Sequence, residues 1–261
     1  MHLCRLIFLL LPLRAFALYN GNPSLPAMPE EGAFIASEDW LGIKLGYLLD
    51  DVYNRKLHME GQDLKHCRKT GQYDSLRNLG VLTFNFMDRV EVFGTLGSLS
   101  MKISHRPFAG KTVSYHSNAH FAWGVGGRAI LAWWGDLQLA LNASWQDSSP
   151  GLSSFKVNQR SQSVRYATAS YREWQVGMGT SYCLEWFIPY VGIDYSDFRT
   201  RINHLGSISS LIPSKHVTFK SFYPFGLYFG FGLSPYRAFN VNVEARCINE
   251  NAISLSADFR F

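Results

Sequence analysis

The last stretch of the chain, residues 239–261, constrains the fold more than any other. Apolar and polar residues alternate from Phe239 to Cys247 and again, after a short connection, from Ile253 to Phe261. Successive side chains of a β-strand point to opposite sides of the sheet, so this period of two predicts two strands with one apolar and one polar face each. Outer-membrane barrels of bacteria characteristically finish on such a strand, which closes against the first one. We therefore expect Phe259 and Phe261 to act as an assembly signal.

Residues 1–17 predict an export signal that is cleaved near Ala17. Arg5 gives a positive start, residues 6–13 form an apolar run, and residues 15–17 (AFA) form a small-x-small cleavage site. The apolar run is too short to cross a bilayer as a helix, which needs about 20 residues. A buried N-terminal helix is the weaker alternative.

The remaining chain reads as ten strands with little room for helices. We place them at residues 40–53, 79–87, 90–103, 119–133, 137–147, 171–183, 187–200, 217–233, 237–248 and 252–261. Short connections at residues 88–89, 134–136, 184–186 and 234–236 alternate with long polar stretches at 54–78, 104–118, 148–170 and 201–216. Short turns at one end and long loops at the other are typical of transmembrane barrels.

The fold prediction is therefore all-β: a transmembrane antiparallel up-and-down β-barrel of about ten strands, with twelve as the alternative. It forms one domain over residues 40–261, with short periplasmic turns and longer external loops. A Pro-rich lead-in at residues 18–39 precedes it, which we expect to be extended and partly loose.

Alternation alone leaves open which face of the barrel is outside. A soluble barrel buries its apolar face, whereas a transmembrane barrel turns that face to lipid. Small and amide side chains dominate the polar face, which suits a watery lumen, and aromatic residues gather near strand ends, as they do at membrane interfaces. These aromatic residues are Trp40, Tyr53, Trp133, Trp134, Trp145, Trp174, Trp186, Tyr195 and Tyr223. We therefore predict the bacterial outer membrane as the location, with a secreted soluble β-protein as the weaker alternative.

The polar face supplies candidates for lining the lumen. They are Lys44, Thr83, Asn85, Arg128, Gln138, Asn142, Glu244, Arg246, Asp258 and Arg260. Charges of both signs on a lumen wall tune ion selectivity, but the same charges can also pair with one another and fill a narrow barrel. Ten strands enclose more space than an eight-stranded, side-chain-filled barrel and less than a 16-stranded porin. The sequence leaves these two readings open.

Several segments, in order along nearly the whole mature chain, resemble the chlamydial major outer membrane protein family. They are residues 18–23 (LYNGNP), 40–57, 87–89 with 92–97, 172–175 (REWQ), 187–192 (FIPYVG), 243–246 and 259–261. The resemblance implies an outer-membrane porin that is trimeric, disulfide-linked within a cysteine-rich envelope and exposed as an adhesin and antigen. This chain is much shorter than the family's type member and has few cysteines, so it looks like a trimmed, divergent member.

Three cysteines follow the predicted signal. Cys67 falls in the first external loop and Cys247 near the outer end of a strand, so both lie on one side of the predicted barrel and can pair. Cys183 lies by a periplasmic turn, across a hydrocarbon core about 25–30 Å thick. We therefore expect Cys183 to be free or bonded to another chain.

The first external loop, residues 54–78, is expected to be basic. Its cationic residues are Arg55, Lys56, His58, Lys65, His66, Arg68 and Lys69. Such a loop can grip anionic glycans or lipopolysaccharide phosphates. The interspersed acidic residues favour the other interpretation, a solvated loop.

The sequence thus predicts a porin for passive diffusion of small hydrophilic solutes or ions. The alternative is a closed structural or adhesin-type barrel that presents its loops to host or envelope partners. Neither a Gly-x-Ser-x-Gly elbow nor a His-Glu-x-x-His motif is present, so we expect no enzyme and no cofactor or metal. The formal net charge of +5 is too small to indicate nucleic acid. The expected partners are outer-membrane lipid or lipopolysaccharide, the barrel assembly machinery and, from the resemblance, a homo-oligomer such as a trimer and disulfide-linked envelope proteins.

Overall fold

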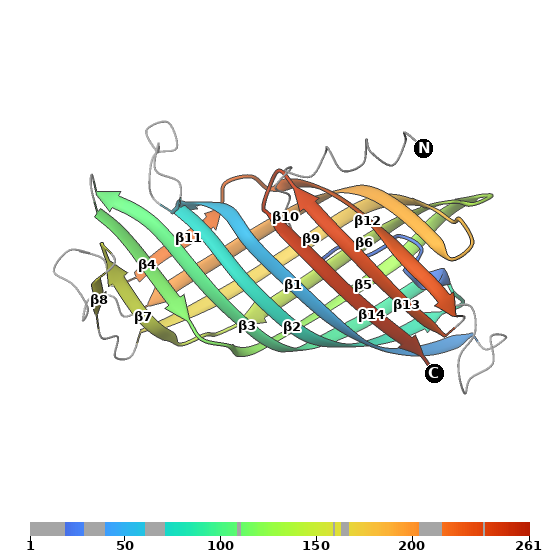
Figure 1. The fold of residues 1–261 in the computed structure, drawn as a ribbon, viewed down its shortest axis with the longest axis horizontal. Coiled ribbons are helices and arrows are strands. Elements are labelled where there is room, and N and C mark those ends of the chain that lie inside the picture. Colours follow the sequence, from blue (N-terminus) through green and yellow to red (C-terminus); the bar gives the residue numbers. More distant parts are fainter. Residues whose placement is uncertain are drawn as a thin grey trace, which may run out of the picture.

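The computed structural model describes residues 19–28, 40–60, 71–108, 111–158, 160–162, 167–203, 216–236 and 238–261. Ten strands form an antiparallel barrel (Figure 1). They are β1 (Leu41–Met59), β2 (Gly71–Phe86), β3 (Val90–Phe108), β5 (His120–Trp134), β6 (Leu137–Ser148), β9 (Thr168–Tyr182), β10 (Phe187–Asn203), β12 (Phe225–Tyr236), β13 (Phe239–Cys247) and β14 (Ala252–Arg260). β14 closes the barrel by pairing with β1 from Lys44↔Arg260 to Val52↔Ala252. The predicted ten-stranded barrel is confirmed.

The β2–β3, β5–β6, β9–β10 and β12–β13 connections lie at one end of the barrel, together with the C-terminus (Figure 1). The β13–β14 connection, residues 248–251, is also short but lies at the opposite end. In the β2–β3 turn, Met87 and Asp88 both have positive φ angles of 52° and 53°, as a tight hairpin turn demands. Gly135 (φ 59°) and Glu185 (φ 51°) serve the β5–β6 and β9–β10 turns. We call this the turn end and the opposite one the distal end.

Four further strands extend the sheet at the distal end (Figure 1). They are β4 (Lys111–Ser117), β7 (Leu152–Val157), β8 (Arg160–Gln162) and β11 (His216–Ser221). β4 pairs with β3 and β7, and β11 fills the gap between β1 and β10. The expected loops at 104–118 and 148–170 are therefore partly strand, which corrects the sequence reading.

Two other boundaries also differ from the prediction. The stretch 54–78 is not one loop, because β1 continues to Met59 and β2 already begins at Gly71. The predicted strand 217–233 is broken into β11 and β12 near Pro224, which has no N–H for a sheet ladder. Both pieces still lie beside β10.

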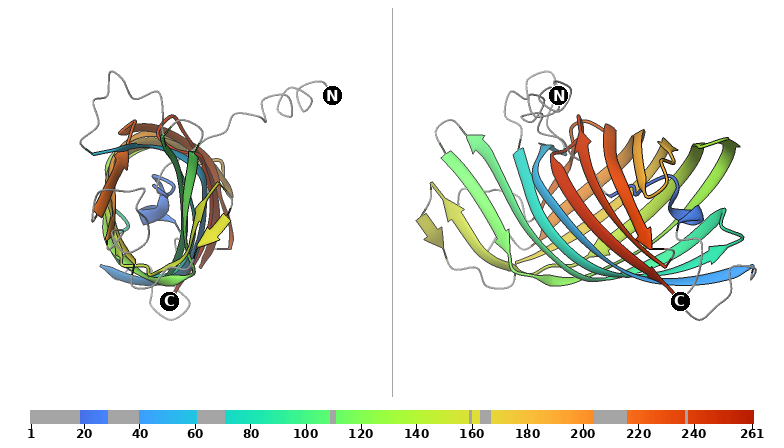
Figure 2. Two further views of the ribbon diagram at one scale, coloured as in Figure 1. Left: turned by 90° about the vertical axis from the view of Figure 1, so that its left-hand side faces the viewer. Right: turned by 45° about the vertical axis from the view of Figure 1, so that its right-hand side comes forward.

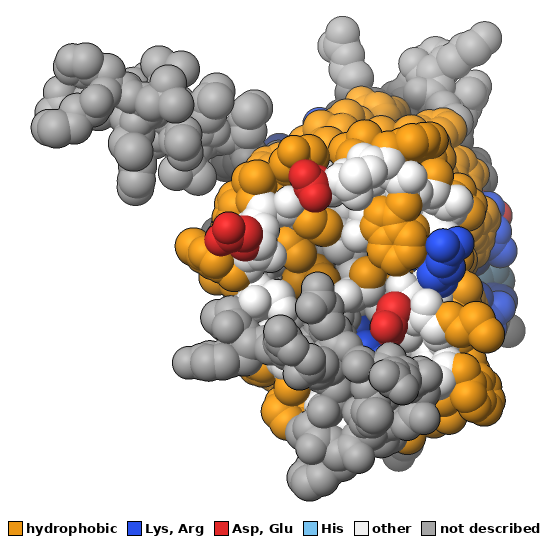
Figure 3. All heavy atoms as spheres, turned by 90° about the vertical axis from the view of Figure 1, so that its right-hand side faces the viewer, with side chains coloured by type: hydrophobic (Ala, Val, Ile, Leu, Met, Phe, Trp, Pro, Cys, Tyr) orange, Lys and Arg blue, Asp and Glu red, His pale blue; other side chains and the backbone are white. Residues whose placement is uncertain are grey.

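Apolar side chains cover the outside of the barrel from the turn end to about the level of Trp174, a zone we call the belt. Leu96 on β3, Ile193 on β10 and Leu255 on β14 point outward in it, exposed. Figure 3 views the turn end, where apolar side chains cover much of the surface. Of the aromatic residues expected at strand ends, all but the half-buried Trp145 are exposed. The apolar face is therefore outside, as predicted.

The interior of the barrel holds a piece of the chain that is not part of the sheet. Residues 19–28 run inside the ring of strands, with a single turn of 3-10 helix, η2 (Leu25–Ala27), begun by Ser24 (Figure 2). Leu25 and Pro26 of η2 are buried. The described part of the Pro-rich lead-in is thus a packed segment, not the loose one expected. The predicted export signal lies outside the described residues.

Candidate functional site: the interior of the barrel

The interior segment, residues 19–28, is bound to the barrel wall first through Glu244 of β13. The backbone N–H groups of Asn20 and Gly21 each donate to one carboxylate oxygen of Glu244, at 2.9 Å in both cases. Tyr190 of β10 also donates its hydroxyl to this carboxylate, at 3.3 Å. Hydrogen bonds to a charged acceptor are stronger than neutral ones. Glu244 is therefore the main anionic anchor of the segment.

Lys44 of β1 binds the other end of the segment. Its ammonium donates to the carbonyl oxygens of Leu25, at 2.6 Å, and Met28. The same ammonium pairs with Glu91 of β3 at 2.6 Å, and Asn85 donates to the Pro26 carbonyl at 2.6 Å. The last turn of the segment thus has its carbonyl groups satisfied by the wall.

Smaller polar contacts fix the middle of the segment. Arg128 and Asn142 both donate to the carbonyl of Asn20, at 3.2 Å each, and the hydroxyls of Ser24 and Ser181 lie 2.6 Å apart. Gly21 has a φ of +80°, and a Cβ there would lie only 2.7–2.9 Å from the Arg128 guanidinium. Glycine is required at this point because other residues are strained at that φ and need more room.

The structure places all ten lumen candidates on the inner side of the wall. Six of them contact the segment or its partners: Lys44, Asn85, Arg128, Asn142, Glu244 and Arg246. Thr83 and Asp258 line a cavity beside Tyr19, Gln138 is buried, and Arg260 pairs with Asp88 at 2.7 Å. The sequence therefore identified the inner face, but nothing in it located the segment that occupies that face.

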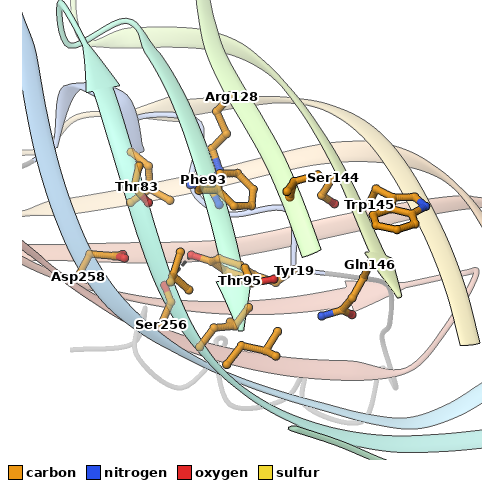
Figure 4. Close-up of a pocket in the computed structure, with 15 residues that line it drawn as sticks. Tyr19, Thr83, Phe93, Thr95, Arg128, Ser144, Trp145, Gln146, Ser256 and Asp258 are labelled. Atoms are coloured by element: carbon orange, nitrogen blue, oxygen red, sulfur yellow. Dashed lines mark hydrogen bonds between the residues drawn. The ribbon is translucent and has the colours of Figure 1, made fainter. Parts of the chain in front are cut away.

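A small cavity of about 50 Å³ lies beside the segment (Figure 4). Tyr19 and Arg128 form one side of it, with Phe93 and Thr95 of β3 and Gln146 of β6 around it. The Arg128 guanidinium lies over the Phe93 ring, 4.7 Å from the centroid. Unfilled space thus remains inside the belt even with the segment in place.

A layer of buried charges crosses the barrel where the belt ends. Glu173, next to Trp174, pairs with Arg55 and, at 3.2 Å, with Arg77. Asp50 pairs with Arg77 at 3.0 Å and with Arg246, and Glu250 pairs with Arg55. These side chains are no more than 1 % exposed. We call these six residues the charge layer: Asp50, Arg55, Arg77, Glu173, Arg246 and Glu250.

Beyond the charge layer, the interior becomes apolar. We call this region the distal core. Its buried members include Leu57, Tyr73, Leu99, Ile103, Tyr115, Phe155, Tyr171, Phe198, Ile202 and Phe219. The rings of Tyr73 and Phe198 lie 4.7 Å apart, and the Arg55 guanidinium stacks on Phe198 at 4.6 Å. In this conformation, side chains close the distal half of the barrel.

Sequence comparison finds relatives over nearly the whole chain. The major outer membrane porin of Chlamydia pneumoniae is 24% identical over 94% of each chain. The porins of Chlamydia psittaci and of Chlamydia trachomatis serovar B are each 22% identical over 94% of this chain and 95% of theirs. The chain is a shorter, divergent relative of these porins. No family model matches the sequence.

Solved outer-membrane barrels resemble this porin relative only loosely. The outer membrane protease OmpT of Escherichia coli is 13% identical, with a TM-score of 0.40 over 85% of this chain and 96% of its own. An outer membrane channel of Pseudomonas putida F1 is 7% identical, with a TM-score of 0.43 over 89% and 98%. Likenesses of this size carry no functional argument. The sequence relatives and the belt together indicate that the chain is an outer-membrane barrel protein.

Among the described residues, no group of His, Cys, Asp and Glu is arranged to hold a metal ion, and no helix is long and apolar enough to cross a membrane. Two histidines beyond the belt lie on opposite faces of the sheet: His105 is buried against Tyr115, and His116 of β4 points outward.

The structure describes two of the three cysteines that follow the predicted signal, Cys183 and Cys247. Cys247 has a free thiol, and Cys67 lies outside the described residues, so the expected pairing of the two is not seen. Cys183 lies by the β9–β10 turn as expected, with its sulfur 3.8 Å from the hydroxyl of Ser24. A bond from Cys183 to another chain stays a prediction.

The expected basic loop is reduced by the extension of β1 and β2. Arg55 is not in a loop but fully buried in the charge layer, because β1 continues past it and pairs Arg55 with Tyr73. Lys56 and His58 also lie on β1. Lys65, His66, Arg68 and Lys69 fall outside the described residues. The alternation of buried Arg55 and Leu57 with exposed Lys56 shows that this stretch is a strand. The sequence did not reveal it because most residues of the stretch are polar.

The two C-terminal aromatic residues lie at the seam of the barrel. Phe259 is exposed on the outer face of β14, and its ring meets that of Phe261 at 5.2 Å. The Phe261 N–H donates to the carbonyl of Ile43 at 2.9 Å. This geometry puts both rings at the turn end. Their role as an assembly signal stays a prediction.

Proposed function

We propose that the protein is a porin-type channel for small hydrophilic solutes or ions, closed in this conformation by the interior segment. One observation carries the proposal. Within the belt the wall is mostly polar, apart from an apolar patch at Leu48, Leu79 and Phe93. The segment inside it is bound by side chains and is not a strand of the sheet. The segment can therefore leave without opening the barrel. The porin relatives support the same class of function.

Passage would be passive diffusion along the polar wall. With the segment displaced, Lys44, Glu91, Arg128 and Glu244 would face the path, and their opposite charges would set its ion preference. The charge layer and the distal core form a second barrier. Conduction thus needs two changes, release of the segment and an opening among the distal strands.

Planar-bilayer recording of the chain from Leu18 onward tests the proposal. In a salt gradient we expect brief discrete current steps with a reproducible reversal potential. The double variant Ser24→Cys/Ser181→Cys can lock the segment, since the two hydroxyls lie 2.6 Å apart. Oxidation should abolish its steps and a reductant should restore them, whereas Ser181→Cys alone should not respond. Unchanged steps in the oxidised double variant would remove the segment from the path.

A second variant loosens the segment without changing the wall. In Gly21→Ala the new methyl group meets the Arg128 guanidinium, and the backbone is strained at φ +80°. We expect more frequent openings than in the unaltered protein. The barrel itself should stay folded, which a mobility difference between heated and unheated samples on an SDS gel would report.

A closed structural or adhesin-type barrel is the second candidate, and the distal half favours it. There the side chains of Arg55, Arg77, Tyr73 and Phe198 are fully buried, so the interior is filled. If the folded protein inserts but stays silent, and Gly21→Ala is silent too, the channel proposal fails. Function would then lie in the surface at the distal end.

A further inference from the structure

A row of cations crosses three neighbouring strands on the outer face, just beyond the belt. Arg172 of β9 lies directly opposite Arg199 of β10, and Arg199 lies opposite Lys220 of β11. Arg201, two residues further along β10, adds a fourth cation on the same face. Like charges directly opposite each other destabilise a sheet. The arrangement is therefore unfavourable unless anions neutralise it.

Among the described residues, carboxylates pair directly with the two ends of this row, and Glu60 also lies near enough to Arg199 to interact with its charge. Arg172 pairs with Asp147 at 3.3 Å, and Lys220 pairs with Glu60 at 2.6 Å. Among the described residues, neither Arg199 nor Arg201 has an ion pair with a carboxylate. The two guanidinium groups on β10 therefore have no direct carboxylate partner among the described residues and can each bind an anion from outside the chain.

These side chains surround a groove, not a flat surface. Arg172, Arg199 and Arg201 line a surface hollow of about 250 Å³ together with Ser170 and Thr218. Guanidinium groups donate paired hydrogen bonds that match the geometry of phosphate, and hydroxyl groups add further donors. The carboxylates of Glu60 and Asp147 also line it and disfavour anions that reach those sides. The groove thus fits a compact anion bound at its centre.

The position of the groove relative to the belt indicates the source of that anion. Trp174, exposed at the edge of the belt, is two residues from Arg172 on the same face of β9. Two residues of a strand span about 7 Å, so the row lies directly above the lipid-facing zone. Lipid headgroups occupy that level at a membrane surface. A soluble anion, in contrast, is not held at that level.

We propose that this groove binds the phosphate of a phosphorylated lipid headgroup in the outer leaflet, with Arg199 and Arg201 as its principal ligands. The site would anchor the β9–β10–β11 side of the barrel to the membrane surface. It is independent of conduction, because all of its residues lie on the outer face.

Lipid retention in nanodiscs tests the proposal. The folded protein is placed in phosphatidylcholine discs that contain either lipid A with its phosphates or enzymatically dephosphorylated lipid A. Lipid retained per protein after mild detergent extraction is then counted by mass spectrometry. We expect the phosphorylated form to be retained at least about tenfold better, from two charge-assisted contacts. Equal retention of both forms would overturn the proposal.

Matched charge variants locate the site. Arg199→Gln/Arg201→Gln should abolish the preference for the phosphorylated lipid. Lys102→Gln/Lys156→Gln removes the same charge from strands outside the groove and should leave the preference unchanged. An equal loss in both variants would show a general charge effect and contradict the site. Heat-modifiable gel mobility confirms that each variant is folded.

Inorganic phosphate distinguishes the two sources of the anion. If millimolar phosphate displaces the retained lipid from the unaltered protein, the groove is a site for soluble phosphate and the lipid proposal is wrong. If retention persists in phosphate and is lost only in the Arg199→Gln/Arg201→Gln variant, a lipid headgroup is the ligand.

Discussion

The interior of the barrel is mostly polar within the belt and mostly apolar in the distal half. On β9, Val176 and Met178 of the belt point outward and Gln175 points inward. Further along the same strand, Ser170 and Arg172 point outward and Tyr171 points inward. The same alternate residues of β9 point outward along the whole strand. Only the chemical character of the two faces changes: the apolar residues are outside in the belt and inside beyond it. Apolar side chains face lipid in the belt and each other beyond it, so the point of reversal marks the edge of the membrane.

The charge layer lies at this reversal. Its six residues come from β1, β2, β9, β13 and the β13–β14 connection. On β9 the inner face changes from polar Gln175 to Tyr171 and Ala169 across Glu173. Buried charges are tolerated when they are mutually paired. The layer therefore joins two interiors that would otherwise pack poorly.

Removing a ring from the distal core should cost the most. Phe198→Ala deletes a fully buried ring that contacts Tyr73 and Tyr171. We expect a loss of about 3–5 kcal/mol in unfolding free energy, since a cavity remains. Thr83→Ala, on the inner face of the belt, should cost less than about 1.5 kcal/mol. Urea unfolding in detergent micelles compares them, and equal costs would mean that the two interiors do not differ.

Breaking the charge layer should have nearly as large an effect. Glu173→Gln removes the carboxylate shared by Arg55 and Arg77 and leaves part of their charge unpaired, at a cost of about 3–5 kcal/mol. The exposed pair Arg172–Asp147 is the control, and Asp147→Asn should cost below about 1 kcal/mol. The same unfolding assay reads both. A small effect of Glu173→Gln would mean that the layer is not sealed from water.

Charge on the lipid face separates the two outer surfaces. Ile193→Lys puts an ammonium in the belt, where the side chain is 56% exposed on the outer face, and should cost about 2–4 kcal/mol in a bilayer. Thr168→Lys, at an exposed position beyond the belt, should change stability by only about 0.5 kcal/mol. Folding yields into liposomes give this comparison. Tolerance of both substitutions would argue against lipid at Ile193.

Acid should loosen the distal half, and only that half. His105 lies beyond the belt, buried between Tyr115 and Phe219, and this burial lowers its pKa to about 4. The unfolded side chain has a pKa near 6.5, so below that pH the unfolded state binds the proton first and stability falls until about pH 4. The protection factors of the amide hydrogens in residues 101–108 and 111–117, which compare their exchange with that of an unstructured chain at the same pH, should fall between pH 7 and 5. His105→Phe should remove this dependence, and its persistence would assign it to other groups.

The sequence predicted the ten barrel strands because alternation and tight turns are local signals. It also placed Lys44, Arg128 and Glu244 on the inner face, since a strand fixes which side each residue takes. It missed the distal strands because their outward residues are polar, so 54–59 and 71–78 read as loop. It missed the interior segment for another reason: the ligands of Asn20 and Gly21 lie more than 220 residues away, on β13.

The most direct test of the reversal is a pair of spin labels on one face of β9. Val176→Cys and Ser170→Cys, each in a background with the native cysteines replaced by serine, put labels outward below and above the proposed membrane edge. In liposomes we expect the label at 176 to collide with oxygen, which dissolves in lipid. The label at 170 should collide with a water-soluble nickel chelate. Nickel access at both positions would mean that no lipid covers the belt, and would contradict a membrane edge between residues 170 and 176.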